Sequence, residues 1–225
     1  DTDLARPKFA IMNPEITYTL PDYQTQCGCA DIMMHTMERY FVLEDTMEIT
    51  DKIAQDVMKN VMKYAKILKK DPENYEARAE IMWCGSLSHN GLTGCGTCGG
   101  DWATHLIEHE LGGMFDVAHG AGLAAVWGSW ARYVMDEKPE RFAQFEVAVM
   151  GVEESDDVKS TALKGIEAVE EFYRMIEMPT NMKELGIDPT DEQIKDMAMK
   201  ATNHDTQQLG AFKKLSAKDL VEIYK

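Results

Sequence analysis

Residues 30–40 read ADIMMHTMERY, and residues 105–120 read HLIEHELGGMFDVAHG. Apolar residues in these stretches recur at helical rather than strand-like intervals. Within the first stretch, Asp31 and His35 lie four residues apart. Because an α-helix has about 3.6 residues per turn, side chains at this spacing point the same way. The first stretch therefore predicts a helix with two potential metal ligands on one face.

The helical pattern continues through most of the chain. A loop is expected only at Gly91–Gly100, where five of ten residues are glycine, and in the proline- and glycine-punctuated stretch after Pro179. Periodicity and capping residues predict helices over about 24–43, 50–68, 71–88, 101–113, 117–133 and 155–176, a short one from Lys138-Pro139, and two opening at Thr190 and Ser216. In this interpretation Asp71 and Asp101 cap their helices, and Pro72 takes the first helical position. The expected fold is all-α, a bundle of about eight or nine helices.

The first 21 residues differ from the rest. Pro14 and Pro21 predict an extended lead-in, with a short strand over Lys8–Met12. We therefore divide the chain into a lead-in, residues 1–21, and a helical metal-binding domain, residues 22–225.

The composition of the chain limits the classes of function that it can have. A net charge of −16 argues against binding nucleic acid or an anionic membrane surface, because phosphates would repel the chain. No apolar run is long enough to span a bilayer, and the start DTDLARPKFA lacks the features of a signal peptide. An odd count of five cysteines, together with 16 methionines, favours a reducing, cytoplasmic setting.

The histidines suggest a metal site. Asp31, His35, His105 and His119 supply one carboxylate and three imidazoles, a set suited to Fe²⁺ or Zn²⁺. Glycines after His109 interrupt the helix, so the chain can turn and bring His119 back towards the other ligands. Three segments would then converge, as they do in metal sites within helical bundles. An ion with a free coordination position would act as a Lewis acid.

Other interpretations of the same residues remain open. His105, Glu108 and His109 match the H-x-x-E-H pattern of zinc metallopeptidases, in which the glutamate acts as a base. A non-catalytic helical module that keeps a metal for stability is a third hypothesis. The pairs Cys27/Cys29 and Cys95/Cys98 are a weaker candidate for a zinc site, and the methionines near Asp31 are expected to fill the core.

Four segments of the chain together resemble a known family. They are RPKFAIMNPEITYTLP, ADIMMHTMERY, GGDWATHLIEHELGGMFDVAHGAGLAAVW and the closing FKKLSAKDLVEIYK. With these motifs the chain is similar to the C-terminal domain of iron-containing (group III) alcohol dehydrogenases, in particular the NADPH-dependent butanol dehydrogenase and aldehyde reductase branch. The resemblance implies the helical fold of dehydroquinate synthase-like C-terminal domains.

The resemblance also assigns roles. It implies that Asp31, His35, His105 and His119 hold Fe²⁺, or Zn²⁺ in some members, and that His109 relays a proton without ligating. The family transfers a hydride between NAD(P)H and a small alcohol or aldehyde. Its nucleotide-binding α/β domain precedes the segment matching RPKFAIMNPEITYTLP, and no dinucleotide fingerprint following a strand occurs here. We therefore expect the missing nucleotide-binding domain as a partner and no turnover by the chain alone, while a homo-oligomer remains a candidate assembly.

Overall fold

The computed structural model describes residues 3–5, 7–44, 48–153 and 155–225. These residues form ten α-helices, nine of them with seven residues or more. The helices are α1 (Asp22–Tyr40), α2 (Glu48–Leu68), α3 (Tyr75–His89), α4 (Ala103–Phe115), α5 (His119–Val134), α6 (Pro139–Phe145), α7 (Val158–Met175), α8 (Met182–Leu185), α9 (Asp191–Ala201) and α10 (Ala217–Tyr224). The all-α prediction is confirmed.

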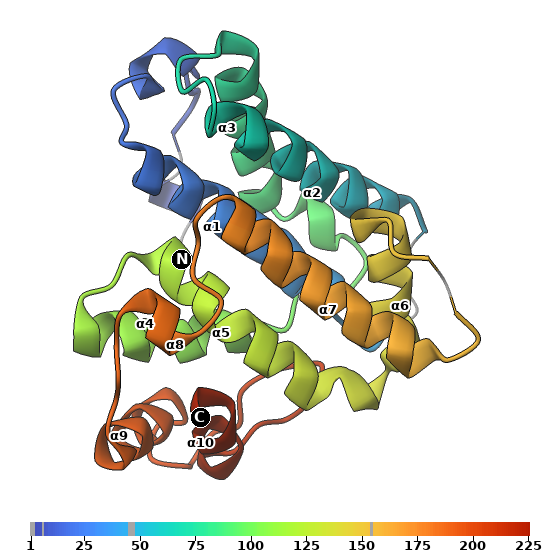
Figure 1. Ribbon diagram of the computed structural model, residues 1–225, viewed down its shortest axis with the longest axis vertical. Coiled ribbons are helices and arrows are strands. Elements are labelled where there is room, and N and C mark those ends of the chain that lie inside the picture. Colours follow the sequence, from blue (N-terminus) through green and yellow to red (C-terminus); the bar gives the residue numbers. More distant parts are fainter. Residues whose placement is uncertain (1–2, 6, 45–47, 154) are drawn as a thin grey trace.

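Helix α1 lies at the centre of the bundle. It packs against α2, α3 and α5, while α4 contacts α5 and α9, and α7 crosses the front of the view over α1 (Figure 1). Met33, Met34 and Met37 on α1 are fully buried, as expected for methionines that fill the core. Aromatic rings gather where α1 ends, with Phe41 stacked on Phe142 at a centroid distance of 4.4 Å. This core fixes the direction of α1 and with it the positions of Asp31 and His35.

Several predicted helix boundaries are confirmed. The predicted capping box of Thr190 with Gln193 forms before α9, and α10 begins after Ser216 as predicted, there with a capping box between Ser216 and Asp219. The predicted short helix at Pro139 is α6, with proline in its first turn. Within the described residues, no helix is long and apolar enough to cross a membrane.

Other local predictions were wrong. Asp71 does not cap α3; Asn74 does, with its side chain accepting the Ala77 N–H at 3.0 Å, because residues 71–74 form a turn first. Helix α4 does not end at Gly112-Gly113 but continues to Phe115. The turn α8 and the π-helical turn η5 (Glu146–Met150) were not anticipated.

The lead-in contains no strand among its described residues. Lys8–Met12 is irregular and exposed, because no neighbouring segment offers the backbone hydrogen bonds that a strand requires. A short 3-10 turn, η2 (Pro14–Thr17), precedes α1 instead. Residues 1, 2 and 6 of the predicted lead-in lie outside the described part of the chain.

Candidate metal centre

Helix α4 starts from an anchored turn. Asp101 lies just before this helix, and its carboxylate accepts the N–H of Ala103 at 3.0 Å and the N–H groups of Ala211 and Phe212 at 2.7 Å each. It thus ties the start of α4 to the C-terminal segment, although the N-cap position itself belongs to Trp102, in a left-handed conformation with φ 63°. The backbone carbonyl of Glu38 on α1 accepts the Asp101 N–H at 2.8 Å. These bonds fix His105 above α1.

A sharp turn returns the chain to the same place. Helix α4 ends at Phe115, Asp116 takes a left-handed conformation, and α5 begins with His119. A Cβ at Gly120 would overlap the backbone of Cys27 on α1, so only glycine allows the two helices to approach this closely. The close approach sets His119 beside Asp31.

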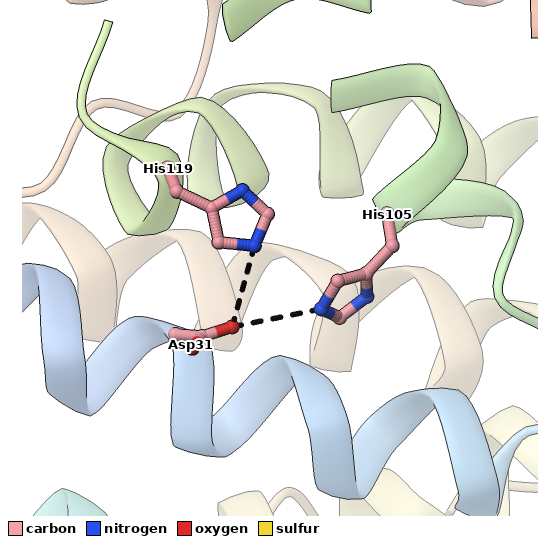
Figure 2. A group of neighbouring side chains, drawn as sticks. All are labelled: Asp31, His105 and His119. Carbon is pink, nitrogen blue, oxygen red and sulfur yellow. Dashed lines mark ion pairs between the residues drawn. The ribbon is translucent and has the colours of Figure 1, made fainter. Parts of the chain in front are cut away.

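Asp31, His105 and His119 form a metal-competent group, in which one potential ligand atom from each residue lies within 4.8 Å of the others (Figure 2). The Oδ1 atom of Asp31 lies 3.5 Å from Nε2 of His105 and 3.6 Å from Nε2 of His119. Two ligands about 2.1 Å from a common ion at a tetrahedral angle would lie about 3.4 Å apart. The spacing therefore suits a divalent ion lying among the three atoms.

The buried polar atoms of this group also fit a cation. Asp31 Oδ1 and His105 Nε2 are both buried, and neither has a hydrogen-bond partner among the described residues. Burial disfavours the charged form of His105, yet the nearby carboxylates of Asp31 and Glu38 outweigh burial and raise the pKa of the imidazole to about 9. For Asp31, burial is likewise outweighed by the surrounding histidines, which hold its pKa below the usual range. The site thus favours added positive charge.

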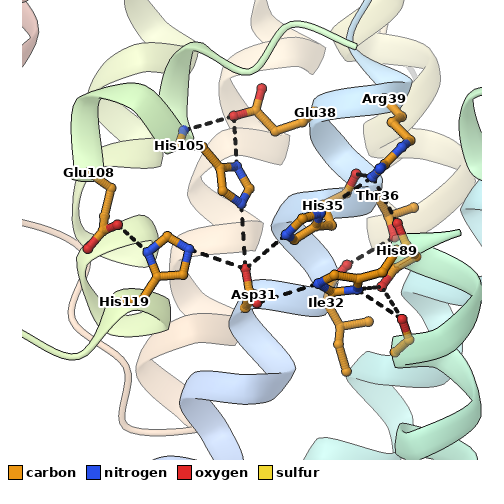
Figure 3. A network of polar contacts seen from close by, with 12 residues as sticks. Asp31, Ile32, His35, Thr36, Glu38, Arg39, His89, His105, Glu108 and His119 are labelled. Carbon is orange, nitrogen blue, oxygen red and sulfur yellow. Dashed lines mark hydrogen bonds and ion pairs between the residues drawn. The ribbon is translucent and has the colours of Figure 1, made fainter. Parts of the chain in front are cut away.

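His35 lies on the other side of Asp31 and belongs to a second group. Its Nε2 is 3.6 Å from Asp31 Oδ1, but its ring stacks on His89 at a centroid distance of 3.7 Å (Figure 3). His89 Nε2 lies 3.7 Å from Asp31 Oδ2, and Asp31, His35 and His89 form the second metal-competent group. Burial lowers the pKa of His35 to about 3, with His89, His105 and Arg39 opposing its charged form against the pull of Asp31. A neutral imidazole is the form that binds a metal.

His109 is not grouped with Asp31 and His105; its ring nitrogen lies instead within 4.8 Å of ligand atoms of His119 and Glu108, in a third group that could hold an ion. Its ring centroid is 6.3 Å from that of His105 and 5.6 Å from that of His119, and the side chain is exposed. Among the described residues, no metal-competent group contains both His105 and His109. A shared ion on the H-x-x-E-H pair, as a metallopeptidase requires, is therefore not favoured by the geometry.

The cysteines do not converge. Cys27 and Cys29 are buried on α1, whereas Cys95 and Cys98 are exposed in the loop before α4. No cysteine belongs to a metal-competent group in the described part of the chain. The zinc site considered for these pairs has no geometric support.

Sequence reasoning missed two residues of the centre. His89 ends α3, and nothing in its local sequence links it to Asp31. Glu38, which accepts a hydrogen bond from His105, carried a usable signal: it follows Asp31 by seven residues and His35 by three, on the same helical face. The periodicity that linked Asp31 to His35 extends to Glu38.

Comparison with known proteins agrees with this centre. Residues 25–225 match the model of the Fe-containing alcohol dehydrogenase family, C-terminal part. The chain belongs to the iron-containing alcohol dehydrogenase family. It is similar to NADH-dependent butanol dehydrogenase A of Clostridium acetobutylicum, with 34% identity over 99% of this chain and 57% of that protein. NADPH-dependent aldehyde reductase YqhD of Escherichia coli is 33% identical over 91% of this chain and 52% of its own length.

Solved structures of related proteins share the fold of this iron-containing dehydrogenase domain. The crystal structure of NADH-dependent butanol dehydrogenase A from Thermotoga maritima superposes with a TM-score of 0.91 at 33% identity, covering 99% of this chain and 56% of that one. The chain therefore spans a little over half the length of the relatives it matches, and the match covers their C-terminal domain.

Proposed function

We propose that this chain is the metal-binding part of an NAD(P)-linked alcohol dehydrogenase, with one divalent ion held by Asp31, His35, His105 and His119. Fe²⁺ is the proposed ion and Zn²⁺ the alternative. The observation that carries the proposal is the approach of three imidazole Nε2 atoms to one carboxylate oxygen, at 3.5–3.6 Å. Two of these four atoms, Asp31 Oδ1 and His105 Nε2, are buried without a hydrogen-bond partner in the described chain.

A bound divalent ion would supply Lewis acidity that stabilises negative charge on a substrate oxygen. The residues suit this task, since the Asp31 carboxylate would offset part of the ionic charge and each imidazole, once its Nε2 proton is displaced by the ion, would offer a nitrogen lone pair. The side chain of His119 is 41% exposed, so the site is open towards solvent on that side. That opening supports substrate access and disfavours a closed, purely structural metal site.

The proposed substrate is a small primary alcohol or the corresponding aldehyde. Support comes from relatives named butanol dehydrogenase and aldehyde reductase. We propose that His109 passes the hydroxyl proton to solvent, because it is exposed and its ring lies 5.6 Å from that of His119. In this scheme His109 moves the proton and does not ligate.

The hydride would come from NAD(P)H bound to a nucleotide-binding domain. Residues 1–21 would connect or pack against that domain, and three of their apolar side chains are highly exposed: Phe9 (78%), Ile11 (84%) and Ile16 (73%). Apolar side chains gathered on one segment suit a covering partner. We propose that the chain alone has no turnover, that it acts in the cytoplasm, and that the complete enzyme can form homo-oligomers.

Metal binding tests the proposal first. The chain, stripped with a chelator and reloaded anaerobically with Fe²⁺ or Zn²⁺, should bind about one ion, whereas His105→Ala and His119→Ala should bind more than about 100-fold more weakly. Loss of an outer partner of a metal ligand already weakens binding by about 10–100-fold, and loss of a ligand should exceed that. His204→Ala, an exposed histidine far along the sequence, is the control. Equal metal content in all four proteins would reject the ligand assignment.

Activity tests the second part. Alcohol oxidation with NAD⁺ or NADP⁺ should be absent for the chain alone and should appear when it is produced together with the nucleotide-binding domain of a butanol dehydrogenase relative. His109→Ala in that assembly should retain its metal but lose rate. Peptide cleavage by the chain, abolished in Glu108→Gln, would favour the metallopeptidase alternative instead.

A further inference from the structure

Glu38 lies directly behind one proposed ligand. It is 2% exposed on α1, and its Oε1 accepts the backbone N–H of His105 at 3.0 Å and faces His105 Nδ1 at 3.2 Å. The same carboxylate therefore holds both the backbone and the ring of a residue on α4 (Figure 3).

Glu108 repeats the arrangement one helix further on. It is 1% exposed on α4, and its Oε2 pairs with Nδ1 of His119 on α5. Space for it comes from α5, where a Cβ at Gly122 would lie 2.6 Å from Glu108 Oε1. The helix that carries each ligand thus also carries the carboxylate for the next: α1 supports α4, and α4 supports α5.

These contacts decide where each ring keeps its proton. A carboxylate at Nδ1 accepts the Nδ1–H, so the neutral imidazole has its lone pair on Nε2. In both histidines that lone pair then faces Asp31 Oδ1, at 3.5 and 3.6 Å. Without a metal, a proton on Nε2 can lie between His105 and Asp31, which agrees with the raised pKa of His105; a bound ion would replace that proton and meet a lone pair on each Nε2.

We infer that Glu38 and Glu108 are positioning residues of the metal centre, which orient His105 and His119 and increase the affinity of both for the ion. The inference rests on the proposed metal site. Burying a charged carboxylate away from water costs free energy, and a nearby cation offsets that cost. Asp31, Glu38 and Glu108 together place three carboxylates around one proposed divalent ion.

His35, the third proposed imidazole ligand, has no carboxylate at its Nδ1 atom among the described residues. Behind His35, the nearest charged group is the Arg39 guanidinium, with Nη1 3.5 Å from Nδ1. Nη1 donates instead to the carbonyls of His35 and Ser88, at 2.9 and 2.8 Å. A cation at Nδ1 does not increase the basicity of Nε2, so the two supported histidines should dominate the affinity.

The test compares Glu38→Gln and Glu108→Gln with Glu170→Gln in the full chain. Glutamine keeps the shape and an oxygen acceptor but removes the charge. Glu170 on α7 is a buried glutamate paired with Arg132 on α5, belongs to none of the groups of described residues that could hold a metal, and serves as the matched control. Chelator competition measures the dissociation constants for Zn²⁺ and Co²⁺. The visible spectrum of bound Co²⁺ and the melting temperature of each metal-free protein are also recorded.

Both site variants should bind metal about 10–100-fold more weakly, with an altered Co²⁺ spectrum, while Glu170→Gln binds as the wild type does. Their metal-free forms should lose no more stability than Glu170→Gln does, because each of the three substitutions removes the charge of one partner of a buried pair. Affinities within about twofold of wild type would overturn the inference, as would a loss of metal-free stability large enough to explain the weaker binding. Failure of the wild-type chain to bind metal would instead contradict the proposed function itself.

Discussion

Two buried glutamates, Glu108 in α4 and Glu146 in the turn η5, occupy similar niches in different chemical settings. Each is almost fully buried, and each lies against a glycine of a neighbouring helix, Gly122 in α5 and Gly165 in α7. Glu108 pairs with an imidazole of the metal centre. Neither carboxylate oxygen of Glu146 has a hydrogen-bond partner among the described residues, and burial raises its pKa well above the usual range.

The difference shows that the niche alone does not set the state of a buried carboxylate. Glycine supplies the space in both places, but the neighbouring groups differ: Glu108 contacts an imidazole, whereas Glu146 has no hydrogen-bond partner among the described residues. Burial without a partner favours the neutral acid of Glu146.

Substitution of the two glycines should have the largest effect. Gly122→Ala and Gly165→Ala should each lower the free energy of unfolding by about 1–3 kcal/mol, because a methyl group would collide with a buried carboxyl group. Only Gly122→Ala should also weaken metal binding, by about tenfold or more, since it displaces the carboxylate behind His119. Chemical denaturation and metal titration of both variants measure the two effects. Equal metal affinities would mean that Glu108 does not support the site.

An effect on stability alone, dependent on pH and without a change in metal binding, is expected from Glu146→Gln. A carboxyl group with a raised pKa in the folded state keeps its proton after the unfolded chain has lost it, near pH 4.3. Wild type should therefore lose about 1.4 kcal/mol of stability relative to the variant for each pH unit above that point, until the folded-state pKa is reached. Melting curves of both proteins between pH 4 and 8 measure the difference. Parallel curves would show that Glu146 is not an isolated buried acid.

The smallest effect is expected at His89, which faces Asp31 without carboxylate support. Its Nδ1 contacts the Gly85 carbonyl oxygen at 2.9 Å, and 44% of its side chain is exposed. His89→Ala should change metal affinity by less than about threefold, well below the effect of losing an outer carboxylate. Metal titrations of His89→Ala and His105→Ala under the same conditions compare the two affinities. A loss as large as that of His105→Ala would make His89 a ligand and move the ion towards the second group.

Much of the fold could be predicted from local signals. The capping boxes at Thr190 and Ser216, the proline at α6 and the buried methionine face of α1 follow from short-range physics, in which each side chain acts on a backbone a few residues away. Some predicted helix boundaries were wrong because residues distant in the sequence, or a following turn, determine where the helix begins. Asp101 resembled an N-cap, but its second oxygen bonds to the distant Ala211 and Phe212.

For the metal centre, helical periodicity is a local property, and it correctly predicted that Asp31 and His35 share a helical face. His105 and His119 do lie on separate helices, but the break between them falls at Asp116 and not at Gly112-Gly113. Which of these groups meet depends on the packing of the helices. This packing placed Glu38 behind His105 and Glu108 behind His119, and it brought His89 from the end of α3 against His35. These contacts join residues from four helices, and their geometry depends on how closely the helices pack, which no spacing along the chain records.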